Sequence, residues 1–94
     1  MKLLKVVKSD KEGKKWTAVF EIDNREKKVH FGATGYTDYT IGATEQQRTN
    51  YRNRHKSGKT AKPDTPNALS YYILWGDSKS RIKNIEAFRK KFNV

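Results

Sequence analysis

Residues 16–22 read WTAVFEI, and large or apolar side chains recur there at every second position: Trp16, Ala18, Phe20 and Ile22. A repeat of two residues places these side chains on one face of a β-strand. The polar cluster SDKEG at residues 9–13 precedes this stretch, and DNRE at residues 23–26 follows it. Both clusters are typical of turns. The stretch therefore predicts one strand with a turn at each end.

Apolar segments beyond the two turns complete a sheet. LLKVV at residues 3–7 is one short run, and KVHF at residues 28–31 resumes the alternation. We predict a three-stranded antiparallel meander over residues 2–32, with an apolar face that requires cover from helices. His30 falls on the opposite face from Phe31, where we expect an exposed or hydrogen-bonded side chain.

Two helices are predicted in the last third of the chain. Thr65 precedes a proline, the favoured pair for a helix start, and residues 66–75 are apolar nearly all round, as in a buried helix that includes Trp75. Ser78 is expected to cap the second helix, residues 79–92. One face of that helix carries four side chains that we expect in the core: Ile82, Ile85, Phe88 and Phe92.

The middle of the chain predicts an irregular connection and then another helix. The glycines of GATG, residues 32–35, are expected to supply positive φ angles in a loop over residues 33–43. Thr44 and Gln47 have the spacing of a capping box, which begins a helix over residues 44–55. This helix has almost no aliphatic side chain, so we expect its arginines to contribute little to the core.

These segments define a single α+β domain of 94 residues. It consists of a three-stranded antiparallel meander followed by three helices that pack on one face, with the last two covering the sheet. Asp38, in the predicted loop, is expected to pair with an arginine or histidine of the first helix. A chain of this length supports one small core and no second domain.

The composition excludes several classes of protein. The chain has 21 Lys and Arg against 10 Asp and Glu, a formal net charge of +11, and no cysteine. It therefore has neither a disulfide framework nor a cysteine-based zinc site. No apolar run approaches the roughly 18–20 residues of a membrane span, and Met1–Lys8 lacks the apolar core of a signal peptide. We predict no membrane contact and no secretion, and the positive charge indicates a polyanionic partner.

Four blocks in a fixed order carry a family resemblance: HFGAxGYxDYT at residues 30–40, RxxYxxRH at residues 48–55, ALS at residues 68–70 and ILW at residues 73–75. Together they resemble a family of uncharacterised small basic proteins encoded by large DNA viruses of algae and protists and by related viral genomes. The resemblance implies a viral origin and a compact domain with β-structure before α-structure. It implies no activity, because the family has none assigned.

One segment has basic residues without acids, although the net charge is spread evenly along the chain, at +4, +3 and +4 over residues 1–34, 35–64 and 65–94. Between Glu45 and Asp64 every charged residue is a lysine or an arginine. The planar guanidinium of arginine can donate two hydrogen bonds to one phosphate, and tyrosine can stack on a base. This mixture is typical of nucleic-acid surfaces, and a solvated face of a basic protein is the alternative interpretation. The candidate nucleic-acid-binding residues are Arg48, Tyr51, Arg52, Arg54, His55, Lys56 and Lys59.

No catalytic residue, cofactor site or metal site is predicted. GATG lacks the Gly-Lys-Ser/Thr ending of a nucleotide-binding P-loop. Asp10 and the run Glu26-Lys27-Lys28 match the loose order of acids and lysine in one nuclease superfamily, but both acids fall in predicted turns. A metal-dependent nuclease is therefore a minor alternative. The two histidines and ten acids form no other cluster with the spacing of metal ligands.

We expect non-catalytic, sequence-tolerant binding of nucleic acid, with DNA favoured, through neutralisation of its phosphates. The alternative is a minor capsid or cement protein whose basic surface contacts acidic virion proteins or the packaged genome. Both roles place the protein in the nucleus or cytoplasm of an infected host cell, or in the virion.

Overall fold

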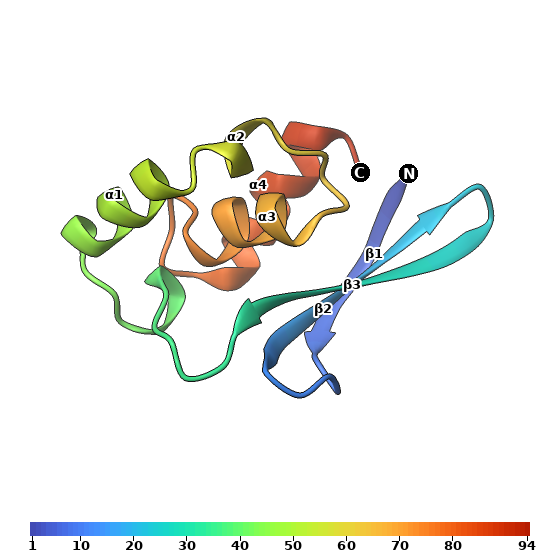
Figure 1. The fold of residues 1–94 in the computed structure, drawn as a ribbon. Helices are drawn as coiled ribbons and strands as arrows, with labels where there is room; N and C mark the ends of the chain where they lie inside the picture. Colours follow the sequence, from blue (N-terminus) through green and yellow to red (C-terminus); the bar gives the residue numbers. More distant parts are fainter.

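Three antiparallel strands form the sheet in the computed structural model, which describes residues 1–94. The strands are β1 (Lys2–Lys8), β2 (Lys14–Ile22) and β3 (Arg25–Ala33), and they lie side by side in the order β1-β2-β3 (Figure 1). The predicted meander is confirmed. The β2–β3 connection is shorter than expected, because Asp23 and Asn24 alone make the turn, with φ angles of 52° and 64°. Positive φ at both central residues is what a type I′ hairpin turn requires.

The strand register builds the apolar face that the sequence predicts. Trp16 pairs with Phe31, and Ala18 pairs with Val29 on the same face. Phe20 and Phe31 are fully buried within the core. Burying a side chain of this size stabilises the fold by roughly 1.5–3 kcal/mol, so this face anchors the domain.

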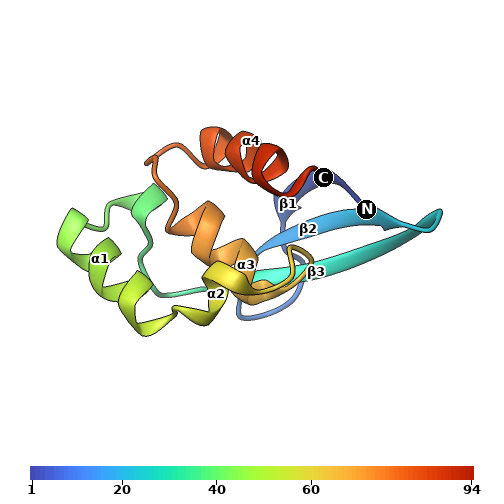
Figure 2. The same ribbon diagram turned by 90° about the horizontal axis from the view of Figure 1, so that it is seen from above.

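Helical segments follow the sheet in the sequence. They are η1 (Tyr39–Ile41), α1 (Glu45–Arg54), α2 (Ser57–Thr60), α3 (Pro66–Leu69), η2 (Ser70–Leu74) and α4 (Arg81–Phe92). The segment α3–η2 and helix α4 pack together against the sheet, whereas α1 lies at the end of the molecule away from the β2–β3 hairpin (Figures 1 and 2). The α+β fold is confirmed, with the last two predicted helices covering the sheet. None of these helices has both the length and the apolar character needed to cross a membrane.

The buried helix changes its winding halfway along. Thr65 caps α3 as predicted, because its hydroxyl accepts a hydrogen bond from the amide of Ala68. The segment then continues as a π-helix, η2, in which the amide of Trp75 donates to the carbonyl of Ser70 five residues earlier. Trp75 is buried, as expected. Single π-turns of this kind occur frequently at functional sites.

Helix α4 begins later than predicted, and its buried face is narrower. Ser80, not Ser78, is the N-cap, because its hydroxyl accepts from the amide of Lys83. Phe88 is buried, but Ile82 is 63% exposed, so its expected place in the core is wrong. Ile82 lies two residues from the buried Asn84, and two residues turn a helix by about 200°, to its other side. The other two expected core positions, Ile85 and Phe92, are partly buried.

A short helix was missed between the predicted helices. Residues 57–60 form α2, where the sequence favoured the end of one helix and a basic loop. Gly58 permits the close packing of α2, because a Cβ atom there would lie 2.7 Å from Cβ of Tyr71. The hydroxyl of Tyr72 also donates to the carbonyl of Lys59 at 2.6 Å. Packing on η2 therefore stabilises a helix too short to predict from its own sequence.

An arginine joins the last helix to the first strand. The register of β1 and β2 shifts between Leu3 and Lys5, which leaves Leu4 in a β-bulge. Arg89 of α4 donates from Nε and Nη2 to the carbonyl of Leu3, both at 3.2 Å, and from Nη2 to the carbonyl of Leu4 at 3.3 Å. The two termini consequently lie close together (Figures 1 and 2).

Candidate nucleic-acid interface

The loop after β3 is fixed by one buried carboxylate. Asp38 is 1% exposed, and it caps η1 by accepting a hydrogen bond from the amide of Thr40 at 2.8 Å. It also forms an ion pair of 2.7 Å with Lys15 of β2. The expected pairing with an arginine or histidine of α1 is wrong. The reason is local: Gly32 and Gly35 have φ angles of +80° and +84°, as predicted, and the loop that they shape places Asp38 within reach of the start of β2.

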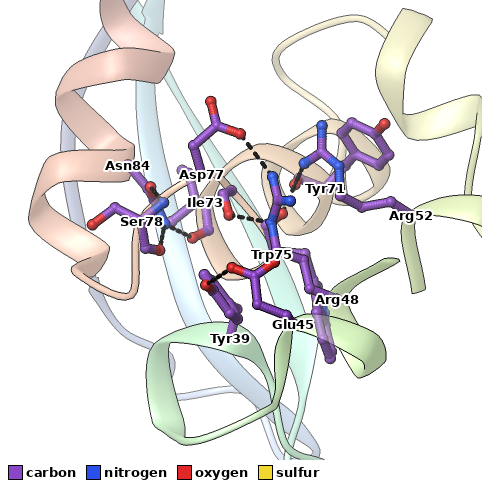
Figure 3. Close-up of polar contacts among 11 residues, drawn as sticks. Tyr39, Glu45, Arg48, Arg52, Tyr71, Ile73, Trp75, Asp77, Ser78 and Asn84 are labelled. Atoms are coloured by element: carbon purple, nitrogen blue, oxygen red, sulfur yellow. Dashed lines mark hydrogen bonds and ion pairs between the residues drawn. The ribbon is translucent and has the colours of Figure 1, made fainter. Parts of the chain in front are cut away.

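Helix α1 attaches to the core through two guanidinium groups. Arg48 donates from Nε to the carbonyl of Gly76 at 2.7 Å and from Nη2 to Asp77 at 2.7 Å. Arg52 donates from Nη1 to the carbonyls of Tyr71 (3.2 Å) and Trp75 (2.7 Å) (Figure 3). The carbonyls at the end of a helix have no partner within the helix, and cations are favoured there.

This attachment corrects the expectation that the arginines of α1 contribute little to the core. The capping box of Thr44 and Gln47 is confirmed at the start of the helix, and no residue of α1 is fully buried. Arg48 and Arg52 take the place of an apolar stripe. The guanidinium carbon of Arg52 also lies 3.9 Å from the centre of the Tyr71 ring, which adds a cation–π contact.

Three aromatic rings form a continuous stack beside these arginines. The ring of Tyr51 lies parallel to that of Trp75, with centroids 4.4 Å apart, and on its other side parallel to that of His55 at 4.0 Å. We call Trp75, Tyr51 and His55 the aromatic stack. Burial raises the pKa of the Tyr51 phenol, and the Ser70 side chain opposes this shift. Trp75 forms the buried end of the stack and the half-buried His55 ends it on the outer side.

The aromatic stack lines a groove of about 760 Å³. The start of β2, the loop after β3, helix α1 and the segment α3–η2 all contribute to its walls. We call it the basic groove. Besides the stack, six polar, aromatic or basic side chains line it: Lys14, Tyr36, Gln47, Asn50, Arg54 and Asn67.

The basic groove has an excess of positive charge. Asp38 is the one acid among its lining residues, and it is already paired with Lys15. Lys14 and Arg54 form no ion pair. The open face of the sheet carries both signs of charge: Lys2 lies there directly opposite Glu21, which in turn pairs with Glu26, and Lys5 and Lys28 flank Val19. The groove is distinguished by aromatic rings beside its unpaired cations, and these cations make it favourable for an anion.

The candidate residues from the sequence are divided by the structure into three groups. Tyr51, Arg54 and His55 line the basic groove. Arg48 and Arg52 bind carbonyls of the protein itself. The remaining two, Lys56 and Lys59, are exposed at the start and in the last turn of α2 and do not line the groove.

Sequence reasoning missed several residues of the groove. Lys14 and Tyr36 lie in segments distant from α1 in the chain, and Tyr36 is 73% exposed. Asn50 and Asn67 add two amide side chains. Of these residues only Tyr36 gives a signal in the sequence, because it is an aromatic residue in a predicted loop and loops commonly carry binding residues.

The acids of the nuclease pattern do not meet. Asp10 lies in the β1–β2 connection, whereas Glu26 lies in β3 beside the other end of β2. The placement of Glu26 in a turn is wrong, because the two-residue turn lets β3 begin at Arg25. The structure contains no group of three or more histidine, cysteine or acidic side chains that could hold a metal ion. His30 is hydrogen-bonded, as expected: its Nδ1 lies 2.7 Å from Thr17 Oγ1 and 2.9 Å from Ser9 Oγ.

Fold and groove together define a small α+β domain with a basic, aromatic-lined groove. The model of the family of unknown function DUF5754 matches residues 4–55, more than half of the chain, and the chain belongs to this family. It is also 42% identical over 80 residues to Uncharacterized protein L851 of Acanthamoeba polyphaga mimivirus, an alignment that covers 77% of this chain and 80% of the viral protein. No solved structure matches the chain. The resemblance to an uncharacterised viral family is confirmed.

Proposed function

We propose that the protein binds nucleic acid without catalysis and with little dependence on sequence, and that DNA is the favoured ligand. The observation that carries this proposal is the pair of unpaired cations, Lys14 and Arg54, at a groove lined by aromatic and amide side chains. Cations that lack an acidic partner can neutralise phosphates without first breaking an ion pair. Aromatic rings accept any base, because every base has a π-face.

The phosphate contacts in this proposal differ from those expected from the sequence. Lys14 and Arg54 border the groove, and the exposed Lys56 and Lys59 extend the basic surface along the chain from His55. Arg48 and Arg52 support α1 from behind through their bonds to the protein's own carbonyls. About four phosphates would then be neutralised, which corresponds to a slope of about −3.6 for log K against log salt on duplex DNA and about −2.8 on single strands.

The test is a titration of fluorescently labelled DNA by anisotropy at several salt concentrations. The double variant Lys14→Gln/Arg54→Gln should weaken binding and flatten the slope by about 0.9 for each lost contact on duplex DNA. The matched control is Lys83→Gln/Lys90→Gln, which removes two exposed cations from α4 and should change binding less. Equal losses in the two variants would mean that the charge acts as a diffuse field, and the groove proposal would be wrong.

A competition experiment separates this proposal from a virion protein that contacts acidic partners. Such a role needs positive charge but makes no use of the aromatic stack. Polyglutamate should displace labelled DNA only weakly if the groove is a nucleic-acid site, because a polypeptide carboxylate offers no base to stack. Displacement by polyglutamate as effective as that by unlabelled DNA would favour the acidic protein partner.

A further inference from the structure

We infer that the basic groove accepts an unpaired base, so that the protein prefers single-stranded over duplex nucleic acid. This inference rests on the proposed function and adds the form of the ligand. It is carried by the shape and chemistry of the groove: an aromatic stack in its wall, amide side chains beside the stack and cations without acidic partners.

The aromatic stack is placed to be extended. Trp75 and Tyr51 are covered by their neighbours in the stack, whereas the half-buried ring of His55 ends it within the lining of the groove. An unpaired base can stack on such a ring, since histidine and tyrosine are among the side chains used for this purpose. A base within a duplex is already stacked on both sides and cannot.

The groove has the size and the polar groups that one nucleotide needs. Its volume of about 760 Å³ falls within the range of about 300–1,000 Å³ for small-molecule sites. The amides of Asn50 and Asn67 both line it. Asn50 Oδ1 already accepts a hydrogen bond within α1 and Asn67 Nδ2 donates one to α2, which leaves Asn50 Nδ2 to donate to the edge of a base and Asn67 Oδ1 to accept from it. Arg54 and Lys14 supply the positive charge for the phosphates on either side of that base.

Tyr36 offers a second aromatic surface. It is 73% exposed, although tyrosine is usually a residue of intermediate burial. It follows Gly35, whose positive φ turns the chain at this point, and its side chain borders the groove. An exposed tyrosine in a glycine-shaped loop suits a ring that covers a bound base from the open side.

The experiment compares labelled oligothymidylate of about 15 nucleotides, a length in the range that single-strand sites of this kind occupy, with a duplex of the same length. Single-strand binding should be at least about tenfold tighter at the same salt concentration. His55→Ala and Tyr36→Ala should each weaken binding of the single strand by about 5- to 100-fold, and the loss should be clearly smaller on the duplex.

A second variant of His55 keeps the test independent of folding. His55→Phe retains a flat ring and loses the 3.0 Å contact between Nδ1 and the carbonyl of Tyr51. It should bind oligothymidylate as the wild type does, and the circular dichroism of each variant should match that of the wild type. Loss of binding in His55→Phe as large as that in His55→Ala would overturn the stacking role.

The failure of this inference is distinguishable from that of the proposed function. If the protein binds the duplex as tightly as the single strand, the inference of an unpaired base is wrong and the proposed nucleic-acid binding stands. A preference for a duplex of defined sequence would contradict both the inference and the sequence tolerance of the proposed function. If neither probe binds at low salt, both are wrong.

Discussion

Arg52 donates a 2.7 Å hydrogen bond from Nη1 to the carbonyl of Trp75, the same residue whose amide closes the π-turn onto Ser70. One side chain of α1 therefore holds the end of the irregular helix that carries the buried ring of the aromatic stack. The bond thus joins α1 to Trp75, which lines the groove, although Arg52 itself does not.

Replacing Arg52 should destabilise the protein. Arg52→Gln leaves the carbonyls of Tyr71 and Trp75 without a charged donor and removes the contact with the Tyr71 ring, so the free energy of unfolding should fall by about 1–3 kcal/mol. Urea denaturation measures this change. Arg54→Gln is the matched control, because it removes the same charge from an exposed residue with no partner, and its effect should stay within about 0.5 kcal/mol. Equal effects would contradict the structural role of Arg52.

Substitution by alanine at two apolar positions of α4 should lower the free energy of unfolding by very different amounts. Phe88→Ala removes a buried ring and should lower the free energy of unfolding by about 3–5 kcal/mol. Ile82→Ala removes a side chain that is 63% exposed, and the loss should be below about 1 kcal/mol. Thermal unfolding followed by circular dichroism separates the two. A large effect at Ile82 would place this side chain in a contact that the single chain does not make.

Gly76 should tolerate no side chain. A Cβ atom there would overlap with the carbonyl oxygen of Tyr72 and lie 2.8 Å from Cγ of Asn84. The Asn84 amide is itself fixed, because Nδ2 donates to the carbonyls of Ile73 and Ser78 at 2.8 and 2.7 Å (Figure 3). Gly76→Ala should therefore prevent stable folding, or cost more than about 3 kcal/mol.

The control for Gly76 is Gly13→Ala. Its Cβ atom would meet nothing within 4 Å, but its φ of +83° is unfavourable for alanine. The expected loss is about 1–2 kcal/mol. If Gly13→Ala were the more damaging substitution, backbone strain and not packing would dominate at these glycines.

Asp64 should make stability depend on pH in the acid range. Its hydrogen bond from Lys27 lowers the pKa of the carboxyl below the usual value of 3.8. The stabilisation is therefore present above that value and is lost as the pH falls through the lower pKa of the folded protein. Its size should be below about 1 kcal/mol, because the Lys27 side chain is 50% exposed. The melting temperatures of wild type and Asp64→Asn should differ at neutral pH and converge near about pH 2, and a difference that persists in acid would contradict this ion pair.

The sheet and the starts of α1 and α3 could be predicted because their signals are local. The alternation in residues 16–22 defines β2, and the caps at Thr44 and Thr65 act on amides only three residues away. The narrower buried face of α4 could not be predicted, because apolar spacing alone does not reveal that the polar Asn84 is buried and that Ile82, two residues away, is exposed.

The groove could be predicted only in part, since its walls come from four distant segments. Tyr51, Arg54 and His55 were named from the charge and aromatic content of one helix, and all three line it. The roles of Arg48 and Arg52 left no signal, because their partners are mostly backbone carbonyls, which every residue has. An arginine that binds phosphate and one that binds a helix end look alike in a sequence.

The bond between Arg89 and the bulge of β1 has a consequence for how copies of the chain behave together. β1 is an edge strand of the sheet, and an exposed edge is a template on which another chain can add a strand and begin to aggregate. Two carbonyls of this edge, those of Leu3 and Leu4, already accept hydrogen bonds from Arg89, and the bulge breaks the regular spacing that an incoming strand would need. The contact that joins the two ends of the chain should thus also disfavour the addition of a foreign strand at this end of β1.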